Sequence, residues 1–182
     1  MNKRAAAFLL PVGIALATAA VAEANNITTT ATVTGAGSVS LAAGTTASFS
    51  DTLDGTDQTV TYQLPLTIVD ARGTGGGWNL TVTSTQFTAG THTLATSASS
   101  LTTVASTCNT GSTCTNPTNA ITLPIAVPAA VTAPTAVKFF NSAASTGMGS
   151  FTVTPTISVT IPGNAYAGSY ASTVTVAVAA GP

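Results

Sequence analysis

The sequence predicts an all-β protein, an antiparallel β-sandwich of Ig-like or Greek-key style in a single domain. Beyond about residue 25 the chain is dominated by Thr, Val, Ser and Gly, which suit strands and turns and disfavour helices. Short runs alternate between apolar and polar residues, and Gly and Pro separate them. A length of 182 residues fits one domain.

The N-terminal segment reads as a secretory signal peptide. Two basic residues precede an Ala-rich apolar run over residues 5–20, and small residues at alternate positions follow it. We therefore expect a signal peptide at 1–24 and a domain at 25–182. Prolines interrupt the later apolar stretch at 121–131, so no integral membrane segment is expected after signal cleavage.

Alternating runs predict the strands of the domain. In chain order they cover residues 30–34, 38–41, 59–69, 78–83, 151–154, 157–161 and 170–179. Their polar positions carry Thr in place of the charged residues that usually protect exposed strands. Because proline cannot donate a backbone hydrogen bond, we expect four prolines to protect sheet edges: Pro65, Pro124, Pro155 and Pro162.

Charged residues make up 5 % of the chain, against about 25 % in ordinary soluble proteins. If cleavage follows Ala24, Arg72 and Lys138 are the two remaining cations, against four aspartates, for a net charge of −2. Nucleic-acid binding, which needs clustered Lys and Arg, is thereby excluded. Bulk charge also cannot hold an anionic polymer.

The two cysteines, Cys108 and Cys114, enclose a short segment rich in turn-forming residues. In an exported chain such a pair predicts a disulfide at a loop tip. A zinc site would need two further ligands, and the chain has one His. We expect no metal and no cofactor.

Few residues could support catalysis. His92 lies in a polar segment and is expected to be solvated, and no nucleophile elbow of the Gly-x-Ser-x-Gly type occurs. Three aspartates, Asp51, Asp54 and Asp57, form an acidic turn. A solvated turn explains them better than a Ca²⁺ loop, because the closing Glu of an EF-hand is missing. The protein is not expected to be an enzyme.

The least repetitive stretch runs from Ile68 to Val82. Asp70 and Arg72 are two residues apart, so in an extended chain their side chains point to the same side. We expect them to form an ion pair, or Asp70 to cap the glycine-rich loop at 73–77. The only tryptophan, Trp78, opens the strand that follows.

Trp78-Asn79-Leu80, preceded by Asp70-Ala71-Arg72-Gly73-Thr74-Gly75-Gly76-Gly77, resembles the proximal motif of the WxL family of bacterial cell-surface domains. The family closes with a Tyr, four residues, a Thr-Trp-x-Leu motif and a small-Pro ending. Here Tyr170 precedes Thr175-Val176-Ala177-Val178 with the same spacing, and Gly181-Pro182 comes last. Val176 and Val178 stand where the family has its second Trp and its Leu, so the distal motif is degenerate.

The resemblance implies a secreted, non-catalytic protein at the cell surface that associates non-covalently with the bacterial cell wall through peptidoglycan. It assigns the wall-binding motif to Trp78, Leu80, Asn79, Asp70, Arg72, Gly75, Gly76 and Gly77, and the distal motif to Tyr170, Thr175, Val176 and Val178. Three positions remain open for Trp78: its indole is a flat platform for sugars, it is part of the core, or both hold, with one edge of the indole buried.

A structural role is the alternative to wall binding. Uncharged, Thr-rich strands permit edge-to-edge pairing, so the protein could be a surface subunit that assembles with itself or with another surface protein.

Overall fold

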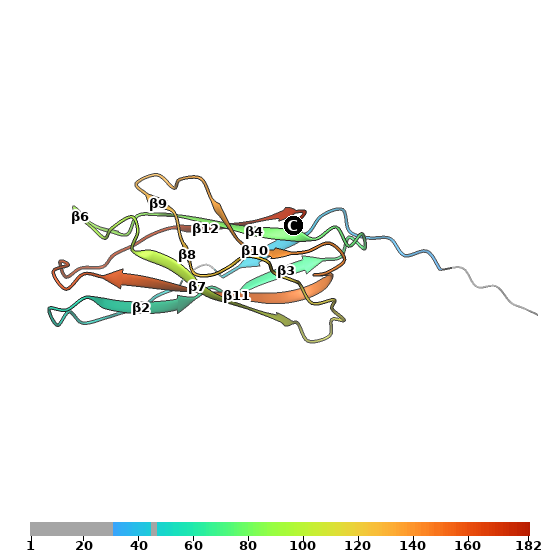
Figure 1. Ribbon diagram of the computed structural model, residues 1–182, viewed down its shortest axis with the longest axis horizontal. Coiled ribbons are helices and arrows are strands. Elements are labelled where there is room, and N and C mark those ends of the chain that lie inside the picture. The colour runs from blue at the N-terminus through green and yellow to red at the C-terminus, as the bar shows by residue number, and fades with distance from the viewer. Residues whose placement is uncertain (1–30, 45–46) are drawn as a thin grey trace, which may run out of the picture. The chain divides into compact units, whose positions relative to one another are not determined.

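The computed structural model describes residues 31–44 and 47–182, so the predicted signal peptide at 1–24 lies outside the described residues. The chain divides into two units, Met1–Thr32 and Val33–Pro182, and the second contains all the strands named below. Every regular element in the described residues is a strand, which confirms the all-β prediction (Figure 1). Accordingly, no helix that could cross a membrane occurs in this part of the chain.

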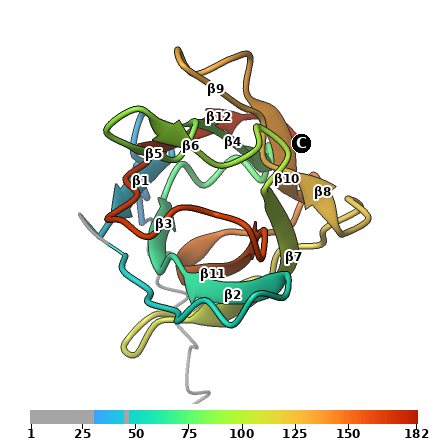
Figure 2. The same cartoon turned by 90° about the vertical axis from the view of Figure 1, so that its left-hand side faces the viewer.

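Two sheets and a short hairpin contain the strands. The first sheet contains β1 (Ser40–Ala43), β2 (Gln58–Gln63), β3 (Leu66–Asp70), β7 (Ser99–Cys108), β8 (Ile125–Ala126) and β11 (Gly149–Ile161). The second contains β4 (Trp78–Thr85), β9 (Ala129–Ala130), β10 (Val137–Ser142) and β12 (Val174–Ala180). The hairpin pairs β5 (Thr88–Ala89) with β6 (His92–Thr93). The sheets lie in two layers, as in a sandwich (Figure 2).

The longest strand, β11, is internal to its sheet. It pairs with β7 along one side and with β3 and then β2 along the other, always antiparallel. The β2 and β3 pairings keep one register, because Gln63 faces Thr156 and Leu66 faces Val153. The two strands therefore follow β11 as a single strand interrupted at Pro65.

Pro155 corrects one sequence-based expectation. It lies inside β11, paired with Val104 of β7, and its carbonyl accepts a hydrogen bond from the Leu64 amide at 3.1 Å. Pro155 lies between the residues of β11 that pair with β3 and those that pair with β2. The position without an N–H donor therefore falls where the neighbouring strand is itself interrupted. A proline was expected at an edge, but here it is tolerated at the interruption of a neighbouring strand.

The core lies between the two sheets. Along β11, alternate residues from Phe151 to Val159 are buried, as the period of two requires. Their partners come mainly from β3, β4 and β10. The largest side chains with under 2 % exposure are Trp78, Phe139, Phe151, Leu66, Ile68, Leu80, Leu101 and Ile157.

Several strand predictions differ from the structure. Residues 31–34 carry no strand, and Val33 is 93 % exposed. The runs at 151–154 and 157–161 join into β11. The alternation pattern missed β7 and β10, and β9 pairs with β4 in parallel, against the all-antiparallel expectation.

Candidate functional site

The two sequence motifs meet on neighbouring strands. Trp78, Leu80 and Val82 of β4 face Ala180, Val178 and Val176 of β12 in an antiparallel ladder. About a hundred residues separate these partners in the chain, so only the sheet brings them together. Both valines of the distal motif are half-buried beside the core.

The Trp78 side chain is fully enclosed, with 0 % exposed. Its ring lies 5.6 Å from that of Phe140, and its indole Nε1 donates to the Gly147 carbonyl at 2.9 Å. Leu80 is also 0 % exposed. Of the positions left open for Trp78, the structure has the core position, and the indole is not exposed as a platform for sugars.

Asp70 and Arg72 form a two-pronged ion pair. Arg72 Nε donates to Asp70 Oδ1 and Nη2 donates to Oδ2, each at 2.8 Å, which confirms the predicted pairing. The hydrogen bonds from Arg72 lower the pKa of the nearly buried Asp70 carboxyl. The same Nη2 also donates to the Gly77 carbonyl at 2.6 Å. The pair therefore holds both ends of the glycine-rich loop.

Close backbone contacts explain two glycines of this site. Gly77 has a φ of +68°, and a Cβ there would collide with the carbonyl oxygen of Ser142. Gly147 has a φ of +69°, and a Cβ there would lie 2.6 Å from the Trp78 Nε1. Only glycine combines this conformation with such close packing. The loops at 73–77 and 143–148 are thus pressed together over the tryptophan.

Three further hydrogen bonds connect Gly181 and the two loops at this end of the sheet. The Asn79 amide nitrogen donates to the Gly181 carbonyl at 2.7 Å, and the Gly181 amide donates to Gly77 at 3.1 Å. The Ser145 amide donates to the Gly75 carbonyl at 2.7 Å. We call this assembly of residues 70–79, 142–149 and 181 the motif end.

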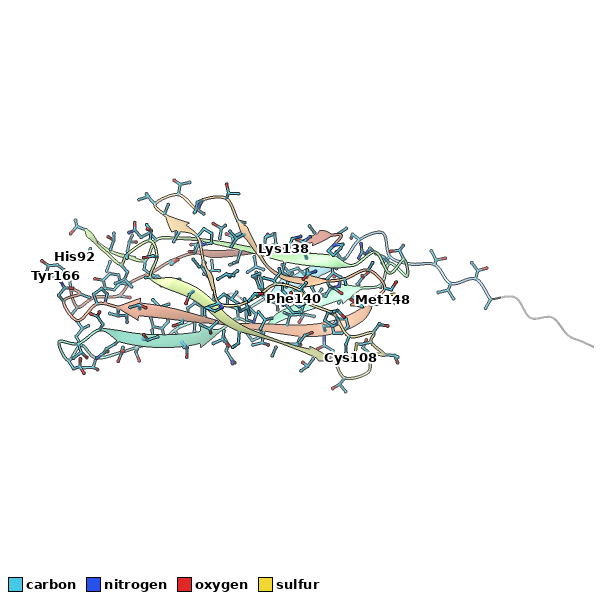
Figure 3. All side chains as sticks on the ribbon, viewed as in Figure 1. His92, Cys108, Lys138, Phe140, Met148 and Tyr166 are labelled. Atoms are coloured by element: carbon cyan, nitrogen blue, oxygen red, sulfur yellow. A yellow bond between two sulfur atoms is a disulfide. The ribbon has the colours of Figure 1, made fainter. Side chains whose placement is uncertain are left out.

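The predicted disulfide is present and borders the motif end. Cys108 and Cys114 are joined, with their Cα atoms 6.0 Å apart. Thr115, just after the bridge, pairs with Met148 and accepts a hydrogen bond from the Gly147 amide at 2.7 Å. Cys108 and Met148 lie at the same end of the strands, whereas His92 and Tyr166 lie at the other (Figure 3).

The outer surface of the motif end is small and polar. Gly73, Thr74 and Gly76 are exposed, and Gly75 is half-buried. The Thr74 hydroxyl accepts a hydrogen bond from the Gly76 amide at 3.3 Å. Of the residues assigned to the wall-binding motif, only Gly76 is exposed and Gly75 and Arg72 are half-buried, while Asp70, Gly77, Trp78, Asn79 and Leu80 are buried.

The distal motif does not share one environment. Thr175 is exposed on β12, opposite Thr83. Tyr170 lies before the strand, and its hydroxyl donates to the Tyr166 carbonyl at 3.0 Å. Tyr170 therefore belongs to the far end of the unit and not to the motif end.

The carboxylates of the acidic turn already accept hydrogen bonds from the protein. Asp54 accepts from the Thr56 amide and hydroxyl, which lowers its pKa, and Asp57 accepts from the Gly163 amide at 2.9 Å. Across residues 31–44 and 47–182, no three His, Cys, Asp or Glu side chains converge as metal ligands would. His92 stacks on Tyr166 with ring centroids 3.9 Å apart.

Sequence reasoning missed the loop that covers Trp78. Phe140, Ser142 and Gly147 complete the motif end, and Ser145 has a φ of +65°. The glycines at 147 and 149 flank Met148 and were the one available signal of a tight turn.

One of three comparisons with known proteins gave a match. A family model described as "WxL domain surface cell wall-binding" matches residues 23–182. Searches of the curated proteins and of the solved structures returned no match. Since the family match covers nearly the whole chain, the protein belongs to the WxL family of surface, cell wall-binding domains and is located at the cell surface.

Proposed function

We propose that the protein binds peptidoglycan non-covalently and without catalysis, and that the exposed glycine-rich loop at 73–76 makes a contact. The proposal rests on one observation: the residues of the motif hold this loop in place. Trp78 bonds the facing loop, and Arg72 joins Asp70 to Gly77. The motif residues are then positioning residues for a rigid polar surface.

Hydrogen bonding suits this surface better than charge. Its exposed residues are Gly73, Thr74 and Gly76, whose polar groups are backbone amides and carbonyls and the Thr74 hydroxyl. Arg72 is paired with Asp70, and Lys138 donates to the Pro182 carbonyl at 2.9 Å. These are the only two cations among residues 31–182. Because each already has a hydrogen-bond partner, attraction of an anionic polymer by charge is disfavoured.

Sedimentation with purified sacculi tests the proposal. The mature protein is expected to pellet with the sacculi. Gly76→Gln should reduce the bound fraction about tenfold, because it adds bulk to the loop surface. It should still fold, since a Cβ at Gly76 meets only Thr74 Oγ1 at 3.5 Å and Arg72 Nη1 at 3.9 Å.

Val131→Gln is the matched control, because Val131 is 85 % exposed and lies outside the motif end. It should pellet like the wild type. A wild-type protein that stays in the supernatant would remove the proposed function. Equal pelleting of wild type and Gly76→Gln would remove the loop as a contact.

Assembly with itself or with another surface protein is the second candidate, favoured by one observation. β12 has β4 on one side and no strand bonded to its other side among the described residues. Its sequence, from Val174 to Ala180, holds no charge and no proline that would block a further strand. Light scattering after size exclusion tests this candidate, and a strict monomer at high concentration would argue against self-assembly.

A further inference from the structure

A groove of ≈ 1220 Å³ lies away from the motif end. Its walls include residues 47–53, the junction of β2 and β3, and residues 165–176 leading into β12. Tyr166 lies on it, at the opposite end of the strands from Cys108 and Met148 (Figure 3). Pockets for single small molecules measure about 300–1,000 Å³, so this groove has room for several units of a chain.

Aromatic rings are concentrated in this groove. Five line it, and they include all three tyrosines of the chain: Phe49, Tyr62, Phe87, Tyr166 and Tyr170. Phe49 stacks on Tyr62 with centroids 5.6 Å apart and meets Phe87 edge-on at 5.9 Å. Tyr62 is half-buried beneath Phe49, and this burial raises the pKa of its hydroxyl to about 12.

Tyr166 forms a more open platform. Its side chain is 65 % exposed, and its ring stacks on His92 at 3.9 Å and 14°. A smaller hollow of ≈ 280 Å³ lies beside it and shares Ala165, Tyr166 and Tyr170 with the groove. The two hollows therefore adjoin each other at Tyr166.

The lining is almost free of charge. Among the described residues of the groove there is no Lys, Arg or His, and Asp51 is the one charged group. Polar groups are present as hydroxyls and an amide, from Thr52, Gln63 and Ser169 for example. This combination disfavours anionic polymers. It matches a neutral chain with alternating apolar faces and hydroxyl groups, since aromatic faces cover the former and hydrogen bonds satisfy the latter.

We propose that this groove binds the glycan chain of the wall, with sugar rings against Tyr166, Tyr170 and the Phe49–Tyr62 floor. The inference rests on the proposed function and adds a second contact surface to it, distinct from the motif end. Its ligand class is a neutral, β-linked chain of N-acetylated hexosamines, and a bound chain of several sugars would extend past Tyr166 into the smaller hollow.

Titration of the mature protein with chitohexaose, a neutral N-acetylglucosamine hexamer, tests the groove alone. Calorimetry should detect binding, and amide chemical shifts should change along 165–176 and not along 73–77. Tyr166→Ala should raise the dissociation constant about tenfold, as expected for the loss of one aromatic anchor. Tyr166→Phe keeps the ring and should bind like the wild type.

Val131→Ala is the matched control, because it truncates an exposed apolar side chain outside the groove. Tyr166→Ala should fold, because its exposed ring contributes little to the core, and an unchanged melting temperature checks this. No binding of chitohexaose, or unchanged binding by Tyr166→Ala, would overturn the inference. So would chemical-shift changes confined to the motif end.

Further outcomes distinguish the groove from the proposed function, and the glycan from other occupants of the groove. A protein that pellets with sacculi but does not bind chitohexaose keeps the proposed function and loses the groove. A protein that binds chitohexaose but not sacculi keeps the groove and loses the proposed function. Groove shifts caused only by free stem peptides, or only by raising the protein concentration, would assign the groove to a peptide or a second copy and overturn the glycan.

Discussion

At the scale of single residues, Trp78 has a structural role, because it supports the loop that covers it. Its indole fills the space below the loop at 143–148 and bonds the Gly147 carbonyl. A tryptophan at this point of the chain joins apolar volume to one directed N–H, which no other side chain of that size offers. The motif is thus a device for fixing two loops over the core.

Trp78→Phe is expected to lower the free energy of unfolding by about 1–3 kcal/mol, because it leaves the buried Gly147 carbonyl unpaired. Chemical denaturation measures the change. The folded variant should still pellet with sacculi, since the ring is not exposed. Loss of pelleting by a variant shown to be folded would instead make Trp78 a contact.

Asp70 gives a residue-scale prediction about pH. Its pKa is lowered from 3.8 by Arg72, so its stabilising contribution is present above pH 3.8 and is lost as the pH falls through the lower folded value. Asp70→Asn should reduce the free energy of unfolding by about 3 kcal/mol at neutral pH, because it leaves the Arg72 charge without its partner.

Denaturation of wild type and Asp70→Asn over a pH series checks this. The difference between them should narrow as the pH falls below 3.8, because the wild-type carboxyl is then also becoming neutral. Asp51→Asn should change stability by under about 0.5 kcal/mol, because this exposed carboxylate bonds only the Thr52 amide among the described residues. A pH-independent difference would contradict the ion-pair explanation.

At the scale of elements, the disulfide loop braces the motif end. Thr115 pairs with Met148 and bonds the Gly147 amide, so the bridge at Cys108 and Cys114 is connected to the residue that Trp78 contacts. Replacing both cysteines by Ser should lower stability by about 2 kcal/mol, near the low end for disulfides because the loop is short.

Melting curves of the double Ser variant measure that loss. Amide hydrogen exchange should also speed up at 143–148, because this loop depends on Thr115. The exchange of β12 should stay as in the wild type, since β12 bonds β4 and not the disulfide loop. Equal acceleration in both segments would show general destabilisation in place of a local brace.

At the scale of the whole molecule, the scarcity of charge predicts how the proposed wall binding responds to salt. Both cations of residues 31–182 have hydrogen-bond partners, and the proposed glycan groove contains none. Sacculus binding should therefore change little from about 0.01 M to about 1 M ionic strength, although the Debye length falls from about 30 to about 3 Å.

Pelleting across this salt series is the measurement. A steep loss of binding with rising salt would show that charge attraction dominates, against the expectation. A moderate gain at high salt would remain consistent with aromatic and hydrogen-bonded contacts, since excluded salts strengthen apolar burial.

The sequence alone determined the fold class, the disulfide and the family, and it named the Asp70–Arg72 ion pair as one of two alternatives. These depend on local quantities: period-two alternation, the spacing of two cysteines, two side chains on one face, and the order of residues around Trp78. The alternating run at 59–69 also predicted the segment that forms β2 and β3. The run, with Pro65 inside it, did not indicate that both strands pair with β11.

Only the tertiary structure decided which residues are buried in the core and which are exposed. Trp78 belongs to the core because β4 is internal to its sheet and the loop around Gly147, some 70 residues away, covers it. The aromatic groove likewise joins residues near 49, 62, 87 and 166, which share no local pattern. Burial depends on contacts between distant segments, and a period in the sequence specifies only the face on which a side chain lies.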